Sequence, residues 1–187
     1  EFQYQNPILG REHVLIGISQ SGETMDTLNA VRLGKSRRAL CIGITNEPGS
    51  TLSHVVNPTG VFLNAGTEKA VASTTAFTAQ VAVLAMMAIR TAQVRGSADG
   101  KELGRFIREL HGVPALLEQA LKTEPQIKEI ASLYKGAKRF FFIGRRYGVP
   151  LAHEGALKLN EIAYVNSFGY AAGELKHGPI ALVRKGV

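Results

Sequence analysis

Three titratable residues in the C-terminal third have the types and spacing that could move a proton. Glu154, Lys158 and Glu161 are separated by four and then three residues, within a segment, 152–163, that the sequence predicts to be helical. Side chains at this spacing share one face of a helix. A carboxylate there could act as a base while the ammonium stabilises an anionic intermediate. The same spacing is also typical of an exposed ladder of ion pairs.

Uncharged hydrogen-bond donors gather at a second place, near the N-terminus. Ser19, Gln20, Ser21 and Thr24 lie between an apolar strand, 14–18, and a segment with helical periodicity. Donors at a helix N-terminus are typical of a phosphate site. One such residue could simply cap the helix, but three hydroxyls and an amide exceed that need. The loop is neither a Walker loop nor a dinucleotide-binding loop, because the required Lys and glycines are missing.

A third polar stretch, 173–179, brings Glu174, Lys176 and His177 into one predicted turn. The imidazole of His177 could move a proton, although a lone histidine more often has a structural role. The histidines of the chain show no paired ligand spacing, so we do not predict a metal site.

Alternating strands and helices are expected to position these residues. Such alternation predicts an α/β fold with a parallel sheet flanked by helices, and ligands at the carboxyl ends of its strands. The charged stretch after residue 95 favours a boundary, so we divide the chain into a first unit (1–95), a helical connector (96–123) and a second unit (124–187). The expected strands are 14–18, 38–45, 55–56, 61–63, 140–143 and 180–183, and the first two are expected to be buried on both faces. The expected helices are 24–34, 50–53, 106–121, 127–134 and 152–163, with one or two further buried helices in 69–94. Gly112 and Pro114 are expected to break the helix at 106–121.

Composition limits the class of protein. The chain has 187 residues, 45% of them apolar, which is enough to bury a core. Its net charge of +7 comes from scattered basic pairs without interleaved aromatic residues, so we do not predict nucleic-acid binding. We find no signal peptide and no apolar run of about eighteen residues, and therefore expect a soluble, cytoplasmic protein. Cys41, the single cysteine, lies in an apolar run and is expected in the core.

Four motifs, in one order, resemble those of the sugar-isomerase (SIS) family. Together they resemble the isomerase half of the glutamine:fructose-6-phosphate amidotransferases, and the resemblance covers essentially the whole chain. The motifs are Ser-Gln-Ser-Gly-Glu-Thr at 19–24, Asn-Ala-Gly-Thr-Glu at 64–68 with Val-Ala-Ser-Thr at 71–74, Glu-Gly-Ala-Leu-Lys-Leu at 154–159 with Glu161, and Ala-Gly-Glu-Leu-Lys-His-Gly-Pro at 172–179.

The resemblance implies a fold, a reaction and a set of roles. In that family two SIS units, each a parallel sheet with flavodoxin-like layers, convert fructose-6-phosphate and glutamine-derived ammonia into glucosamine-6-phosphate, with no metal or cofactor. The family's chemistry also implies a homodimer. By motif, Ser19, Gln20, Ser21 and Thr24 would hold the phosphate, Val71 and Ser73 would lie against the sugar, Glu161 would move a proton between C1 and C2 with Lys158 as electrostatic partner, and His177 would open the sugar ring from a neighbouring subunit.

The chain also departs from the family pattern. It begins at Glu1 rather than Met, and it shows no match to the glutaminase domain, to the strand and Gly-Thr-Ser-type loop that usually precede this region, or to the C-terminal tail with its Schiff-base lysine. We therefore expect a piece of a longer protein with both SIS units truncated. Thr75 stands where the family often has Lys, and Asn160 where a charged residue is common.

Three functions stay open at this point. The first is the isomerase part of the aminating synthase. The second is a related SIS enzyme that removes an amine from an amino-sugar phosphate. The third is a non-catalytic module that senses sugar phosphates, which would leave Glu161, Lys158 and His177 without a task.

Overall fold

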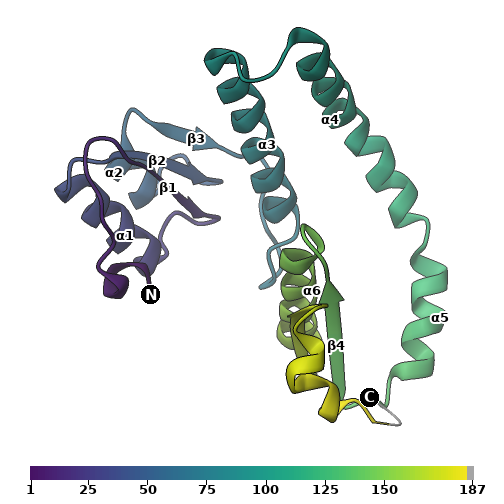
Figure 1. Ribbon diagram of the computed structural model, residues 1–187. Coiled ribbons are helices and arrows are strands. Elements are labelled where there is room, and N and C mark those ends of the chain that lie inside the picture. Colours follow the sequence, from purple (N-terminus) through teal and green to yellow (C-terminus); the bar gives the residue numbers. More distant parts are fainter. Residues whose placement is uncertain (185–187) are drawn as a thin grey trace. The chain divides into compact units, whose positions relative to one another are not determined.

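The computed structural model describes residues 1–184, and the chain divides into two compact units between Leu110 and His111. Figure 1 shows the helices and strands coloured in chain order. Both sheets are parallel and carry helices, which confirms the predicted α/β class. The division into 1–95, 96–123 and 124–187 stays a prediction.

The first unit is built on a three-stranded parallel sheet. Strands β1 (Val14–Ser19), β2 (Leu40–Thr45) and β3 (Gly60–Phe62) lie in that order. In this register Ser19 of β1 pairs with Thr45 of β2, so the strands end at the same edge. A short 3-10 helix, η1 (Phe2–Gln5), precedes the sheet.

Two helices cover one face of this sheet. They are α1 (Met25–Ser36) and α2 (Thr51–Val56). The core between them and the sheet contains Leu28, Val31, Cys41, Leu52 and Val56. The predicted core position of Cys41 is confirmed, and burial raises the pKa of its thiol.

The predicted strand at 55–56 is wrong. Val55 and Val56 end helix α2, which begins after Ser50, whose hydroxyl accepts a hydrogen bond from the amide of Ser53. Within that helix Val56 reaches the apolar core, so packing selects the helical conformation over the strand that β-branched residues favour.

The prediction that β1 is buried on both faces is also wrong. Its even-numbered residues Val14, Ile16 and Ile18 are 36–57% exposed. The other face of the sheet is covered around Ile44, where the N-terminal part of helix α3 (Thr75–Arg95) packs. This cover leaves Val14, Ile16 and Ile18 of β1 partly exposed.

Helix α3 is a single helix, and it is less buried than expected. Only Ala76 and Val83 of its 21 residues are buried. Its apolar residues are distributed around the whole circumference, so one packed side leaves the others exposed. By length and composition alone α3 is long and apolar enough to cross a membrane, contrary to the sequence-based expectation that no segment is.

The next two helices are α4 (Gly100–Leu121) and α5 (Glu124–Tyr134). We expected Gly112 and Pro114 to break the first of these, but α4 is continuous through both. Proline removes one backbone hydrogen bond and crowds the preceding turn, while the hydrogen bonds on either side can carry the helix past it.

The second unit contains two parallel strands, β4 (Arg139–Gly144) and β5 (Asn166–Ala171), with helix α6 (Gly148–Ala163) packed on them. Close approach of helix and sheet requires a glycine in β5, because a Cβ on Gly169 would lie 2.6 Å from the Cα of His153. The sequence-based prediction missed β5, whose Asn, Ser and Gly positions interrupt the apolar pattern.

The predicted strand at 180–183 is wrong. Residues Pro179–Leu182 form a 3-10 helix, η3, directly after another, η2 (Leu175–His177). Pro179 has a φ suited to a helical turn, and the amides of Ala181 and Val183 donate to the carbonyls of Gly178 and Ile180 at 2.9 and 3.1 Å. These local bonds replace the pairing that a strand would need.

Candidate functional site

Three polar loops leave the same edge of the first unit's sheet. They follow β1, β2 and β3, and they comprise residues 19–24, 46–50 and 63–74. In parallel α/β sheets this edge is where ligands bind.

The first of these loops is shaped by its own hydroxyl groups. The Oγ of Ser19, which is buried, accepts a hydrogen bond from the amide of Gly22 at 3.0 Å and lies 2.9 Å from the Oγ1 of Thr24. The Oγ of Ser21 accepts from the amide of Glu23 at 3.2 Å. The structure thus brings the predicted phosphate-binding residues into one turn at the start of α1, and it gives Ser19 a role inside the loop.

Gly22 is required by the shape of this turn. Its φ of +70° is in the left-handed region, and a Cβ added there would collide with the side chain of Ser50 and lie 2.9 Å from the Oγ1 of Thr45. The carbonyl of Gly22 accepts a hydrogen bond from the amide of Leu52 at 3.0 Å. The loop is therefore in direct contact with the start of α2.

Two further contacts connect the loop to the segment after β2. The carbonyl of Gln20 accepts hydrogen bonds from the Oγ1 of Thr45 at 3.2 Å and from the amide of Asn46 at 3.0 Å. The carboxylate of Glu23 accepts from the amide of Thr51 at 2.7 Å, and this bond lowers the pKa of Glu23. The backbone of the loop is preorganised before any ligand arrives.

The third loop contains the two residues predicted to lie against a sugar. Val71 is 98% exposed, and Ser73 is half-buried. Ala72 between them is buried, so the backbone is fixed at this point while its neighbours stay accessible.

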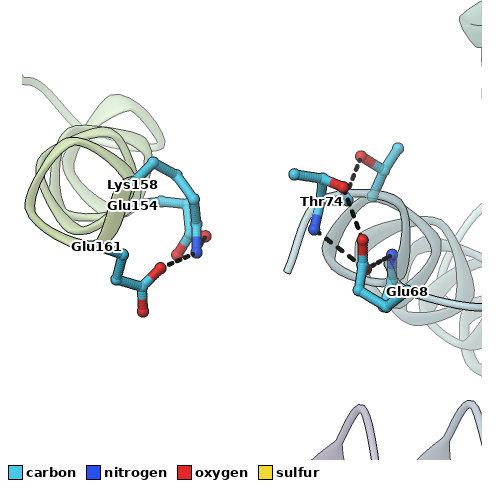
Figure 2. A network of polar contacts seen from close by, with 7 residues as sticks. Glu68, Thr74, Glu154, Lys158 and Glu161 are labelled. Carbon is cyan, nitrogen blue, oxygen red and sulfur yellow. Dashed lines mark hydrogen bonds and ion pairs between the residues drawn. The ribbon is translucent and has the colours of Figure 1, made fainter. Parts of the chain in front are cut away.

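A glutamate in the same loop accepts four hydrogen bonds. Figure 2 shows the carboxylate of Glu68 beside Thr74 at the start of α3. It accepts from the amide and hydroxyl of Thr74 at 3.2 and 2.8 Å, from the hydroxyl of Thr75 at 3.4 Å and from the amide of Ala76 at 3.1 Å. The hydroxyl of Thr74, followed by the amide of Ala76, lowers the pKa of Glu68.

In the second unit, helix α6 presents the predicted acid–base residues together. The Nζ of Lys158 lies 3.1 Å from the Oε1 of Glu154 and 2.9 Å from the Oε2 of Glu161 (Figure 2). Burial acts to lower the pKa of Lys158, but hydrogen bonds and charge from Glu161 and Glu154 outweigh it, and the net shift is upward. The ammonium is therefore fully charged at neutral pH and shared between two carboxylates.

His177 is not part of this cluster within residues 1–184. It ends the exposed 3-10 helix η2, and no hydrogen bond or ion pair joins its ring to Lys158 or Glu161 in that part of the chain. Its predicted role remains a prediction.

The structure also identifies polar residues that the sequence reasoning did not assign. Asn46 and Asn160 each make a pair of hydrogen bonds to a distant backbone segment: the amide group of Asn160 accepts from the amide of Ser167 at 2.7 Å and donates to its carbonyl at 3.0 Å. The corresponding bonds of Asn46 reach Ala65 and Gly66. No local pattern predicts such contacts, since the partners are 7 to 20 residues away.

Several proteins of known name match this sequence over nearly its whole length. A protein of Bacteroides thetaiotaomicron and one of Chlorobaculum tepidum, both named glutamine–fructose-6-phosphate aminotransferase (isomerizing), are 45% and 48% identical to it over 183 residues. The matches cover 98% of this chain and 30% of each relative. The chain therefore spans about a third of the length of these proteins.

Solved structures show the same fold. The C-terminal domain of glucosamine-fructose-6-phosphate aminotransferase from Francisella tularensis matches with a TM-score of 0.89 and 38% identity, over 92% of this chain and 49% of that one. Glucosamine-6-phosphate deaminase from Thermotoga maritima matches with a TM-score of 0.73 and 25% identity, over all of this chain and 54% of that one.

The family model for the SIS domain matches residues 1–90 and 133–187. The first match includes most of α3, which is thus an element of that domain. With a match over more than half of its length, this chain belongs to the SIS domain family.

Proposed function

We propose that this chain is the sugar-phosphate isomerase part of an enzyme that makes glucosamine-6-phosphate from fructose-6-phosphate and glutamine-derived ammonia. The observation that carries the proposal is the Glu154–Lys158–Glu161 cluster on α6, in a chain about 45% identical to aminotransferases named as isomerizing. The cluster holds a carboxylate and an ammonium 2.9 Å apart on a partly exposed helix face, and a non-catalytic sensor would leave these groups without a catalytic task.

The first unit holds the residues that bind the substrate in this proposal. Ser19, Gln20, Ser21 and Thr24 bind the phosphate at the start of α1, where backbone amides and the helix dipole favour an anion. This contact supplies binding energy remote from the reacting carbons. Val71 and Ser73 contact the sugar.

Glu161 transfers the proton between C1 and C2. A single carboxylate can take the proton from one carbon and return it to the next on the same face, through an enediol-like or enolamine intermediate. Lys158 forms an ion pair with this carboxylate at 2.9 Å and stabilises the negative charge that develops on the substrate. His177 from the second subunit of a homodimer opens the sugar ring. The enzyme acts in the cytoplasm.

The test is formation of glucosamine-6-phosphate from fructose-6-phosphate and ammonium. We would assay the chain and the complete gene product, each with and without Glu161→Gln. The expected loss of kcat in Glu161→Gln is about 100-fold or more, with KM little changed, because only the proton transfer is removed.

Glu129→Gln is the matched control, since Glu129 on α5 is exposed and makes no ion pair among residues 1–184. Full activity in Glu161→Gln would contradict the assignment of the base. A complete gene product that binds fructose-6-phosphate but forms no product would favour the sensor function.

Amine removal is the second candidate, because the chain matches a glucosamine-6-phosphate deaminase with a TM-score of 0.73. It predicts ammonia release from glucosamine-6-phosphate at a rate that exceeds the synthetic reaction. The wild-type complete gene product, assayed in both directions, separates the two functions.

A further inference from the structure

Asn46 connects the loop after β1 with the loop after β3. Its backbone amide donates to the carbonyl of Gln20 at 3.0 Å. Its side chain accepts from the amide of Ala65 at 2.9 Å and donates to the carbonyl of Gly66 at 2.7 Å. One residue thus contacts the backbone of both loops.

Glu68 holds the other end of the loop after β3. Its carboxylate accepts hydrogen bonds from Thr74, Thr75 and Ala76, so the segment 69–73 is closed between Glu68 and the start of α3. The loop is therefore held at its entry by Asn46 and across its exit by Glu68.

Residues 69–71, between these two contacts, are exposed, whereas Ala72 is buried. Val71 is almost fully exposed although it is apolar, and the buried Ala72 beside it prevents the backbone from turning Val71 inward. Val71 is thus accessible to a ligand on a segment whose two ends are held by six hydrogen bonds.

We infer that Asn46 and Glu68 are positioning residues that set the location of Val71 and Ser73 relative to the phosphate-binding loop, and so determine affinity for the sugar part of a hexose phosphate. The inference rests on the proposed function, because it takes the loop after β1 as the phosphate site. Neither residue contacts the substrate in this assignment.

The competing explanation is that Glu68 only caps helix α3. A cap satisfies free amides at a helix start and contributes to stability. Loss of a cap would lower the melting temperature without selecting between ligands. Loss of a positioning residue would weaken contacts to the sugar while contacts to the phosphate persist.

The experiment compares two ligands that contact different loops. Inorganic phosphate is expected to contact only the loop after β1, whereas fructose-6-phosphate is expected to contact both the loop after β1 and the loop after β3. We would measure the dissociation constant of each by calorimetry in the complete gene product, for the wild type, Asn46→Asp and Glu68→Gln. Asn46→Asp keeps the shape but cannot donate to Gly66, and Glu68→Gln replaces an acceptor oxygen with a donor that faces other donors.

The expected result is a selective loss. Both variants should weaken fructose-6-phosphate binding by about 10- to 100-fold, as expected for a misplaced contact, and change phosphate binding less than about twofold. In the synthetic assay KM should rise by a similar factor, with a smaller fall in kcat. Glu47→Gln is the control for the charge change, because Glu47 is exposed and its side chain makes no hydrogen bond among residues 1–184.

Other results would overturn the inference. Equal losses for the two ligands would mean that the residues support the whole unit, and unchanged affinity for both would mean that they position nothing. If either variant melts at a much lower temperature, Asn46→Ser and Glu68→Asp replace it under the same criteria. A wild type that binds neither ligand would remove the proposed function, and with it this inference, whereas binding of phosphate alone would remove only the assignment of a sugar-contacting loop.

Discussion

At the scale of single residues, the loop after β1 depends on a glycine. Gly22 combines a φ of +70° with close contact to Ser50 and Thr45, so any Cβ would push the loop away from the start of α2. The hydroxyl contacts of Ser19 with Gly22 and Thr24 require the same geometry.

We therefore expect Gly22→Ala to weaken phosphate and fructose-6-phosphate binding by more than about tenfold, because the donors would no longer converge. Calorimetry with both ligands measures the change. Gly49→Ala is the control, as a Cβ there meets nothing within 4 Å. Unchanged binding in Gly22→Ala would show that the phosphate binds elsewhere.

Acid sensitivity is a second property of individual residues. The pKa values of Glu23 and Glu68 are both below the ordinary 4.5 because backbone amides and hydroxyls donate to the charged forms. A lowered folded-state pKa contributes stability that is present above 4.5 and is lost as the pH falls through the folded value.

Thermal unfolding of the first unit should thus occur at lower temperature as the pH falls from about 6 to about 3. In Glu68→Gln the fall should be smaller, because one of the titrating groups is gone. Glu47→Gln should behave like the wild type. If Glu68→Gln and the wild type lose stability in parallel over this range, Glu68 is not a source of the acid sensitivity.

At the scale of elements, helix α4 contains a proline, Pro114, which disfavours the helical conformation. Pro114 lies inside the helix and cannot donate to the carbonyl four residues earlier. Pro125, by contrast, lies in the first turn of α5, where the missing donor has no cost.

We expect Pro114→Ala to stabilise α4 by about 1–3 kcal/mol and to slow hydrogen exchange of the amides around it. Pro125→Ala should change stability by less than about 0.5 kcal/mol. Hydrogen exchange with mass spectrometry measures both. Destabilisation by Pro114→Ala would mean that the proline ring contributes more to packing than it costs the helix.

At the scale of the whole molecule, the chain consists of two units with separate hydrophobic centres. The first unit has the cluster around Leu52 and Val31, both fully buried. The second unit is organised by α6 on β4 and β5, with the rings of Phe141, Phe168 and Tyr170 side by side on the sheet.

Leu52→Ala should consequently destabilise the first unit by about 2–5 kcal/mol through the cavity that it leaves. Hydrogen exchange should then quicken in β1, β2, α1 and α2, while β4, β5 and α6 keep their protection. Leu116→Ala is the control, because that side chain is 61% exposed. Equal acceleration in both sheets would show that the two units unfold as one.

The sequence alone was sufficient for the α/β class, for most strands and helices, for the core position of Cys41 and for the shared face of Glu154, Lys158 and Glu161. These features follow from local periodicity, which depends only on residues close together in the sequence. The SIS family was likewise readable from the order of four motifs, and the family match bears it out.

Only the tertiary structure decided the rest. Val55 and Val56 are helical because Val56 packs into a core assembled from distant segments. Strand β5 is stabilised by parallel pairing with β4. The contacts of Asn46, Glu68 and Asn160 depend on backbone groups that a polar side chain can reach only after folding. Hydrogen bonds between segments distant in sequence leave no periodic pattern, so the residues that position the site could not be identified before the loops were in place.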